Sequence, residues 1–349
     1  PVHPPTILKH GNIDTRGTKW TRAENFVGNG QFTLTTWQIN RIITVRKNEN
    51  YWDAANVSLK EINFYPIENM LTEERAFRTG QLHVTSGLPP QKIEWYKTNR
   101  PGELRIDPYL GTYYYLINVT RKPLDNKKLR KALTLAINRD ELTEHVTKGG
   151  QIPAGCFTPY NTAGYSFDTV LRFDPAEAKR LLAEAGFNDK NPVPTFSLLY
   201  NTLESHHTIA QAIQQMWKEH LGIEVTLINQ EWKVYLASTN SKDYDIARMG
   251  WISDYNDPNS FLDLWVTGSG NNRTGWSNRD YDSLIDAASR ASDQAKRYEY
   301  FKEAESVLMD ELPIIPIYFY TNVYLLHPSV KGWQSNILNI HNYKFISLE

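Results

Sequence analysis

The sequence has little of several features that mark common classes of protein. Its 349 residues contain a single cysteine, Cys156, so an internal disulfide is excluded. No run of eighteen apolar residues occurs, which argues against a membrane-spanning helix. Lys and Arg number 38 against 39 Asp and Glu, for a formal net charge of -1. No overall field would therefore draw the chain to nucleic acid, and we expect no nucleic-acid partner.

Motifs for catalysis and for cofactors are also missing. The sequence has no G-x-S-x-G, H-E-x-x-H, Walker A or G-x-G-x-x-G motif. His206 and His207 are adjacent at a helix start, so they point in different directions and cannot form the i, i+4 face of a zinc site. We expect no cofactor, no metal site and no enzyme.

Aromatic residues and length are what the chain has in quantity. Trp, Tyr and Phe number 10, 20 and 13, or 12% of the residues. Aromatic side chains at this density suit walls around a ligand, and they equally suit a β-rich core. A chain of 349 residues is long enough for two lobes, each with its own core.

Local patterns divide the chain into a β-rich part and an α/β part. Residues 32–46 alternate as in a β-hairpin, and 105–118 form a long extended stretch with a glycine near its middle. Beyond it helices and strands alternate, with strong caps at Asp174-Pro175 and Gly186 and a C′ glycine at Gly222. The apolar strand 314–320 can return the chain to the first part. We therefore expect two α/β lobes joined by two crossing strands.

The segment from Asp243 to Pro258 is the strongest candidate for function. It runs from a strand with a basic residue into Gly250-Trp251, then to Asp254 and a capped helix. An unpaired strand edge at 250–253 could bond the main chain of an extended peptide, with Asp254 holding an ammonium group. The acids between Asp243 and Asp257 leave open a second interpretation, a hydrolase with paired carboxylates.

At this point the residues resemble a known family. Six runs match, in order and over nearly the full length, those of periplasmic oligopeptide-binding proteins, the peptide branch of the solute-binding proteins that serve ABC importers. These runs are 27–34, 48–53, 107–115, 199–202, 229–233 and 250–258. The chain resembles the second and larger part of such a protein.

The resemblance implies an α/β, two-lobed periplasmic-binding-protein fold of the class with an extra domain, here partial. Lobe I would comprise 1–110 and be β-rich, lobe II 111–318 and be the ligand-binding α/β lobe, and 319–349 would return to lobe I. The implied function is capture of short, extended peptides and delivery to the permease subunits of an ABC transporter. Alternatives within the family are binders of a murein peptide, a dipeptide or a nickel complex.

The resemblance also assigns roles to particular residues. Asp254 would meet the peptide α-amino group, and Gly250 and Ile252 would contact its main chain. Arg248 and His206 would help to receive the peptide carboxylate. The walls of the side-chain pockets would include Tyr109, Tyr114, Trp232, Leu236 and Trp251.

Some positions depart from the family pattern. Relatives carry a cysteine pair where Gly111 and Ile252 stand, and an arginine that reaches one pocket where Thr239 stands. The pattern also expects a long segment before Pro1, with a signal peptide that Pro1 to Pro5 do not contain. We therefore interpret the sequence as a partial chain of a periplasmic protein, or of a cell-surface lipoprotein, and expect its missing N-terminal fragment or another partner to cover lobe I.

Overall fold

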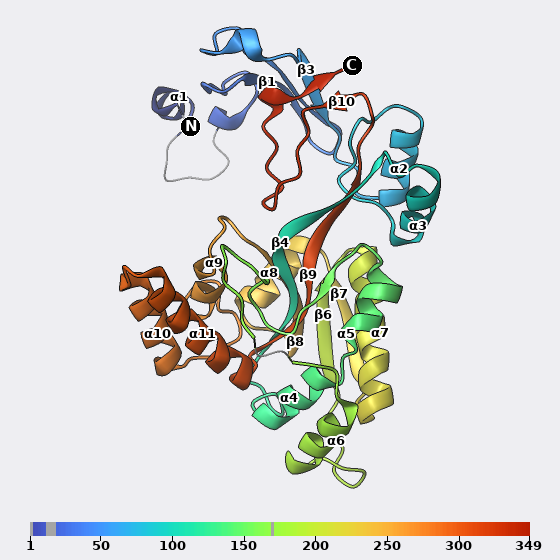
Figure 1. Ribbon diagram of the computed structural model, residues 1–349, viewed down its shortest axis with the longest axis vertical. Helices are drawn as coiled ribbons and strands as arrows, with labels where there is room; N and C mark the ends of the chain where they lie inside the picture. Colours follow the sequence, from blue (N-terminus) through green and yellow to red (C-terminus); the bar gives the residue numbers. More distant parts are fainter. Residues whose placement is uncertain (1–2, 12–18, 169–170) are drawn as a thin grey trace. The chain divides into compact units, whose positions relative to one another are not determined.

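The computed structural model describes residues 3–11, 19–168 and 171–349. The chain divides into two compact units, one formed by 1–107 with 323–349 and the other by 108–322. It leaves the first unit within β4 (Leu104–Ile117) and returns within β9 (Ile314–Leu325), so the predicted two-strand connection is present (Figure 1). Pro1 and Val2, on which the signal-peptide expectation rests in part, lie outside the described residues.

The first unit is built on a small antiparallel sheet with the order β1-β2-β3. The predicted hairpin is formed by β1 and β2, and its register pairs Phe32 with Lys47 and Gln38 with Ile42. A small core of this unit gathers Phe77, Ile93 and Tyr96. The elements of this unit are α1 (Pro4–His10), β1 (Phe32–Gln38), β2 (Ile42–Lys47), β3 (Glu61–Phe64), α2 (Met70–Arg78), α3 (Pro90–Asn99), β10 (Val330–Lys331) and β11 (Ser347–Leu348).

The second unit contains a six-stranded mixed sheet with the order β5-β9-β4-β8-β6-β7. Strand β8 runs antiparallel to β4 and parallel to β6, and β6 runs parallel to β7. Besides β4 and β9, its strands are β5 (Ile152–Pro153), β6 (Phe196–Asn201), β7 (Val225–Gln230) and β8 (Ile246–Ile252). The combination of a mixed sheet and flanking helices confirms the predicted α/β class.

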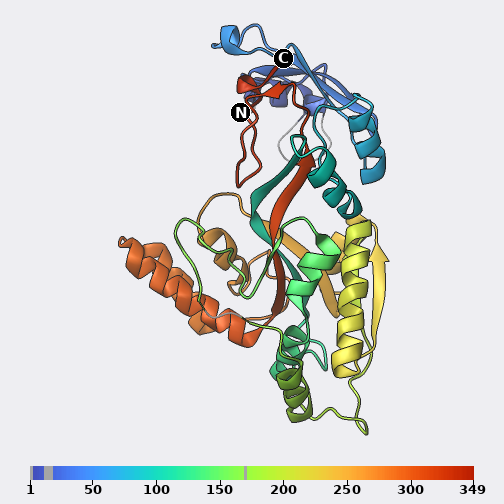
Figure 2. The ribbon, with the colours of Figure 1, turned by 45° about the vertical axis from the view of Figure 1, so that its right-hand side comes forward.

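Helices cover both faces of this sheet, which is why every residue of β4 from 110 to 117 is buried. On one face Tyr113 and Tyr115 join a core with residues of α4 (Lys127–Leu135), α6 (Pro175–Glu184) and α7 (Glu204–Leu221). On the other face Tyr114 contacts Phe157 and Trp265, beside α9 (Asn259–Leu262). Figure 2 shows α7 along one side of the sheet. The remaining helices are α5 (Arg139–Glu141), α8 (Trp232–Asn240), α10 (Arg279–Arg290) and α11 (Gln294–Glu311).

Two helix ends follow the local signals that the sequence carries. The Asp174 side chain accepts a hydrogen bond from the Glu177 N–H and Pro175 opens α6, as the N-cap pattern predicts. Gly222 ends α7 with φ +68, a left-handed conformation that glycine adopts without a steric penalty. Among the described residues, none of the helices combines the length and apolarity needed to span a bilayer.

Candidate ligand-binding site

Strand β8 carries an unpaired edge beside the predicted binding residues. Its pairing with β4 runs from Ile246 to Ile252, whereas its pairing with β6 covers only Ile246 and Ala247. Within the described part of the chain, the β6 side of residues 248–252 therefore has no strand partner. An unpaired edge is the condition under which residues 250–253 could bond the main chain of an extended peptide.

The register determines which main-chain groups face that edge. The Ser253 N–H donates to the Leu110 carbonyl, at 2.9 Å, so this pair is hydrogen-bonded. Because hydrogen-bonded and non-hydrogen-bonded pairs alternate in antiparallel sheets, the groups of Trp251 point toward β4 and those of Gly250 and Ile252 point away from it. Gly250 and Ile252 thus present their N–H and C=O groups to the unpaired side.

The main-chain groups of Arg248 also point away from β4, but its carbonyl already has a partner. The Tyr235 hydroxyl donates a hydrogen bond to the Arg248 carbonyl. An added peptide strand would therefore bond at Gly250 and Ile252, and Tyr235 would mark where the available edge ends.

Close packing explains why glycine stands at two positions near this edge. A Cβ at Gly250 would collide with the Tyr320 hydroxyl and lie 3.2 Å from Arg248 Nη2. A Cβ at Gly111 would lie 2.5 Å from Ile252 Cδ1, because the two residues are direct cross-strand partners. Gly111 and Ile252 are also the positions at which the family resemblance places a cysteine pair, and here the Ile252 side chain occupies the space between the strands.

Asp254 lies two residues beyond the end of β8 and is exposed. Its carboxylate has no hydrogen-bond or ion-pair partner among the described residues. By contrast, Asp257 binds Arg297 through two contacts of 2.7 and 2.8 Å and caps the Asn259 N–H. Burial alone would raise the pKa of Asp257, but Arg297 and the Asn259 N–H hold it below its ordinary value. Asp254 is therefore the carboxylate at this end of β8 that is available to a ligand cation.

Two of the acidic residues between 243 and 257, Asp243 and Asp245, lie far from Asp254. Asp243 and Asp245 both bind Arg121 at the far end of β8, and Asp245 also accepts the Ser197 N–H and hydroxyl. At about 3.3 Å per extended residue, Asp245 and Asp254 are separated by roughly 30 Å. Glycoside hydrolases place their carboxyl groups within about 5–10 Å of each other. This separation does not fit a hydrolase that pairs Asp245 with Asp254.

Arg248 is a partly buried cation without a carboxylate partner among the described residues. Its Nη2 donates to the Tyr320 hydroxyl at 2.8 Å and its Nη1 to Asn201 Oδ1 at 3.4 Å. Its guanidinium carbon lies 4.6 Å from the centre of the Tyr113 ring, and its Nε is buried without a hydrogen-bond partner. A charged group surrounded only by neutral ones can still attract an anion.

His206 lies on α7 against the same tyrosine cluster and is 7% exposed. Its Nδ1 is 3.4 Å from the Tyr113 hydroxyl. Burial, with a smaller effect from the Arg248 charge, lowers the pKa of His206 to about 2. The imidazole is therefore neutral at physiological pH and can serve a carboxylate only as a neutral hydrogen-bond donor.

The predicted aromatic and apolar wall residues have different surroundings. Trp232 is half exposed and stacks on Tyr235 with ring centres 5.7 Å apart, and Leu236 lies one turn further along α8. Tyr109 is partly exposed and meets Tyr320 edge to face. Tyr114 is 3% exposed and lies in the core between rings of the second unit. Trp251 has a buried Nε1 without a hydrogen-bond partner.

Sequence reasoning missed three groups beside Arg248: Tyr235, Tyr320 and Asn201. The aromatic count included both tyrosines, but no local pattern indicated that Tyr320 would accept from the Arg248 guanidinium or that Tyr235 would donate to the Arg248 carbonyl. Gln230, at the end of β7, was also missed, and its Oε1 is buried without a partner. Asn201, Gln230 and Tyr320 lie on β6, β7 and β9, and Tyr235 lies on α8, so only the tertiary fold brings them to the same part of the unit.

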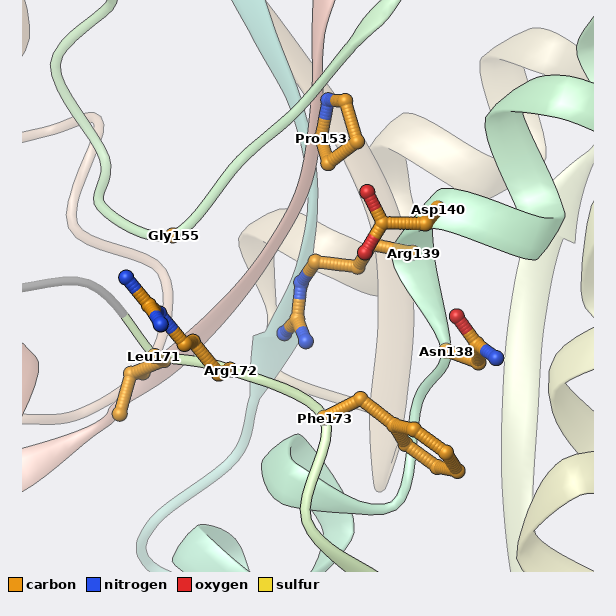
Figure 3. A pocket seen from close by; sticks show the side chains of 8 residues that line it. All are labelled: Asn138, Arg139, Asp140, Pro153, Gly155, Leu171, Arg172 and Phe173. Atoms are coloured by element: carbon orange, nitrogen blue, oxygen red, sulfur yellow. The ribbon is translucent and has the colours of Figure 1, made fainter.

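A cavity of about 500 Å³ lies elsewhere in the second unit and contains none of the predicted binding residues (Figure 3). Arg139 is its most buried charged residue, and its Nε and Nη1 donate to the carbonyls of Pro316, Thr134 and Ile137. Burial lowers the pKa of Arg139 to about 10. The guanidinium thus ties α4 and α5 to β9, which is a structural role.

The structure combines three features that suit a solute-binding protein. Two units are joined by two strands, the sheet of the second unit is covered by helices on both faces, and a free strand edge ends near an acid without a partner among the described residues. The sequence profile of the bacterial extracellular solute-binding proteins, family 5 (middle region), matches residues 2–273. The chain belongs to this family.

Individual relatives agree with this assignment. The oligopeptide-binding protein OppA of Bacillus subtilis is 38% identical over 334 residues, which cover 92% of this chain and 61% of the relative. Among solved structures, the murein tripeptide-binding protein MppA of Escherichia coli matches with a TM-score of 0.91 and 34% identity. OppA of Haemophilus influenzae in complex with the peptide RPPGFSPFR matches with a TM-score of 0.88 and 33% identity. These two matches cover all of this chain and 68% and 69% of the other chains. The chain therefore spans about three fifths of the length of the curated relative and about two thirds of the chains in these structures.

Proposed function

We propose that this chain is the larger part of a binding protein that captures short peptides in an extended conformation and delivers them to an ABC importer. The observation that carries the proposal is the unpaired edge of β8, where Gly250 and Ile252 present main-chain groups and Asp254 follows without a partner. The names of the relatives support the same ligand class, since they include oligopeptide-binding and murein peptide-binding proteins.

The mechanism follows from the chemistry of these groups. A peptide added as a strand would exchange main-chain hydrogen bonds with Gly250 and Ile252, which requires no particular side chain from the guest. Asp254 would hold the peptide α-ammonium group through a charge-assisted hydrogen bond. Arg248 would attract the peptide carboxylate, and the neutral His206 would add at most a hydrogen bond. Affinity would then depend on backbone and termini more than on sequence.

No step in this mechanism changes a covalent bond, so we propose that the protein is not an enzyme. We also propose a periplasmic or cell-surface location, because relatives such as OppA of Salmonella typhimurium are named as periplasmic. The permease subunits of an ABC importer, and a chain that covers the first unit, would be its protein partners.

The test is calorimetric titration of the purified chain with trialanine and with N-acetyl-trialanine. Acetylation removes the ammonium charge, so we expect the unmodified peptide to bind at least tenfold more tightly, in line with about 1.5–3 kcal/mol for a hydrogen bond to a charged group. In Asp254→Asn this preference should shrink to less than threefold. The matched control Asp189→Asn alters an exposed acid that has no partner among the described residues, and it should keep the preference.

Two results would contradict this proposal. Binding of both peptides with one affinity would remove Asp254 from the proposed role. Cleavage of either peptide during a long incubation, followed by chromatography, would favour the hydrolase interpretation instead.

A further inference from the structure

A second cavity of the 108–322 unit, about 480 Å³ in volume, has a basic lining that peptide capture does not use. It lies where the turn after α8 meets the glycine-rich loop 267–277. Its polar lining includes Asn240, Lys242, Ser269, Arg273 and Ser277. This cavity is separate from the free edge of β8, because none of residues 248–254 lines it.

The charge in this cavity is of one sign. Lys242 and Arg273 are its only charged lining residues, and neither forms an ion pair with a described residue. The Nε of Arg273 is buried and has no hydrogen-bond partner. Two acids close to these cations in sequence are engaged elsewhere, since Asp243 binds Arg121 and Asp282 accepts a hydrogen bond from the Thr267 N–H at 2.9 Å. The two cations therefore face the cavity without a protein counter-ion.

Hydrogen bonds hold the Lys242 backbone in an uncommon conformation. Its φ of +58 lies in the left-handed region, which a residue with a side chain rarely adopts. The Asn118 side-chain amide donates to the Lys242 carbonyl at 2.9 Å, and the Lys242 N–H donates to Thr239. Backbone strain of this kind persists only where the surroundings fix it.

Hydrogen bonds and packing also fix the loop 267–277, which forms the other part of the cavity lining. Asn272 donates to the carbonyls of Trp265 and Trp276, both at 3.0 Å, so it closes the loop on itself. Gly275 has φ +78, and a Cβ there would lie 2.5 Å from Thr120 Cγ2, so the loop backbone packs closely against the turn that follows β4. Trp276 is 7% exposed and packs edge to face on Tyr281. The cavity is therefore formed before any ligand arrives.

We propose that this cavity is an oxyanion site, which binds a carboxylate or phosphate group between Lys242 and Arg273. A guanidinium offers paired N–H donors that match both groups, and an ammonium adds a point charge. An oxyanion would supply a partner for the buried Arg273 Nε and would neutralise the two unpaired cations. The proposal does not depend on peptide capture by β8.

The first experiment is equilibrium dialysis of the full chain against radiolabelled inorganic phosphate at low ionic strength. We expect one saturable site, weakened at least tenfold by Arg273→Gln and by Lys242→Met. Arg273→Lys should recover part of the affinity because it keeps the charge. The matched control Lys190→Met removes an exposed cation that forms no ion pair with any described residue, and it should bind phosphate as the unaltered chain does.

A measurement on the unaltered chain keeps the test decisive if a variant fails to fold. Phosphate should slow amide hydrogen exchange in the loop 267–277 and leave exchange in the first unit unchanged. Phosphate binding that never saturates, that is equal in Arg273→Gln, or that leaves exchange in this loop unchanged would overturn the proposal.

A second arm identifies the source of the oxyanion. Ala-Glu-Ala and Ala-Gln-Ala are titrated into the chain with and without saturating phosphate. If the site receives an acidic side chain, phosphate weakens binding of Ala-Glu-Ala and not of Ala-Gln-Ala. If the site receives a free anion, phosphate binds and affects neither peptide. Failure of both peptides to bind would count against peptide capture, while the dialysis result would still decide the oxyanion site.

Discussion

The two units of this chain bury their sheets to very different extents. In the second unit every residue of β4 from 110 to 117 is buried, and helices lie on both faces of the sheet. In the first unit Thr44 is the one buried residue of the three strands β1, β2 and β3. Trp37 on β1 is 55% exposed, and Ile39 in the following turn is 83% exposed. The sheet of the second unit is thus packed on both faces, whereas the sheet of the first unit leaves large apolar side chains at the surface.

This difference shows where the fold obtains its stability. Burial of apolar area contributes about 25 cal/mol per Å², so the thick core of the second unit supplies most of the favourable free energy. The exposed apolar residues of the first unit are the kind of surface that a partner covers. The proposed binding residues lie on the well-packed unit, where their positions are fixed by the core.

The largest expected effect is the loss of stability when a buried tryptophan of the second unit is replaced. Trp217 is fully buried and donates from Nε1 to the Leu133 carbonyl at 2.8 Å. We expect Trp217→Ala to lower the free energy of unfolding by about 3–5 kcal/mol. Trp37→Ala, the same substitution in the first unit, should change it by less than about 0.5 kcal/mol. Urea denaturation followed by circular dichroism measures both, and equal effects would contradict the contrast between the units.

The second prediction concerns a titratable group that is buried in the second unit. Burial raises the pKa of Glu305 to about 7, although Tyr165 and the N–H groups of Phe157 and Thr158 donate to its carboxylate and oppose the shift. The folded state therefore holds the proton more tightly than the unfolded state. This contribution to stability is complete below the ordinary pKa of 4.5 and is lost as the pH rises through about 7.

The size of this effect is on the order of 3 kcal/mol between pH 4.5 and pH 8. Glu305→Gln should remove that part of the pH dependence, because an amide does not titrate. Denaturation of both proteins at several pH values gives the difference curve, with Glu219→Gln as an exposed control. A constant difference between the unaltered chain and Glu305→Gln across this range would show that the carboxyl does not titrate there.

The third and smallest effect is the loss of a helix N-cap, and we expect it to be the same in both units. Asp174 caps α6 in the second unit and Asn69 caps α2 in the first, each through a hydrogen bond of 2.9 Å to a backbone N–H. A cap acts locally, so alanine at either position should cost about 1 kcal/mol. Hydrogen exchange of the amides in each unit measures the two losses separately. A much larger loss in one unit would mean that its cap has a further role.

The elements with strong local signals were predictable from the sequence. The hairpin β1–β2, the capped helix α6 and the long strand β4 follow from alternation, an N-cap pattern and an extended apolar run. The helix α3 and the short strand β5 were not predicted, because neither has a cap or a periodicity that separates it from a loop. Sheet order was beyond reach, since it depends on pairings between residues far apart in sequence.

The candidate binding site was also predictable only where one continuous segment forms it. The free edge and Asp254 could be placed from one continuous segment, because a strand that runs into an acid and a capped helix carries local signals. The surroundings of Arg248 could not, since Tyr113, Asn201 and Tyr320 come from three other strands. The low pKa of His206 likewise follows from burial on a helix face that faces the sheet, which the sequence alone does not reveal.

The most direct test of the central claim is amide hydrogen exchange along β8, resolved by NMR, with and without trialanine. The amides of Met249 and Trp251 point to β4, so we expect them to be protected in both states. The amides of Gly250 and Ile252 should exchange fast without peptide and become protected when peptide binds. Peptide binding that leaves the Gly250 and Ile252 amides unprotected would contradict strand addition at this edge.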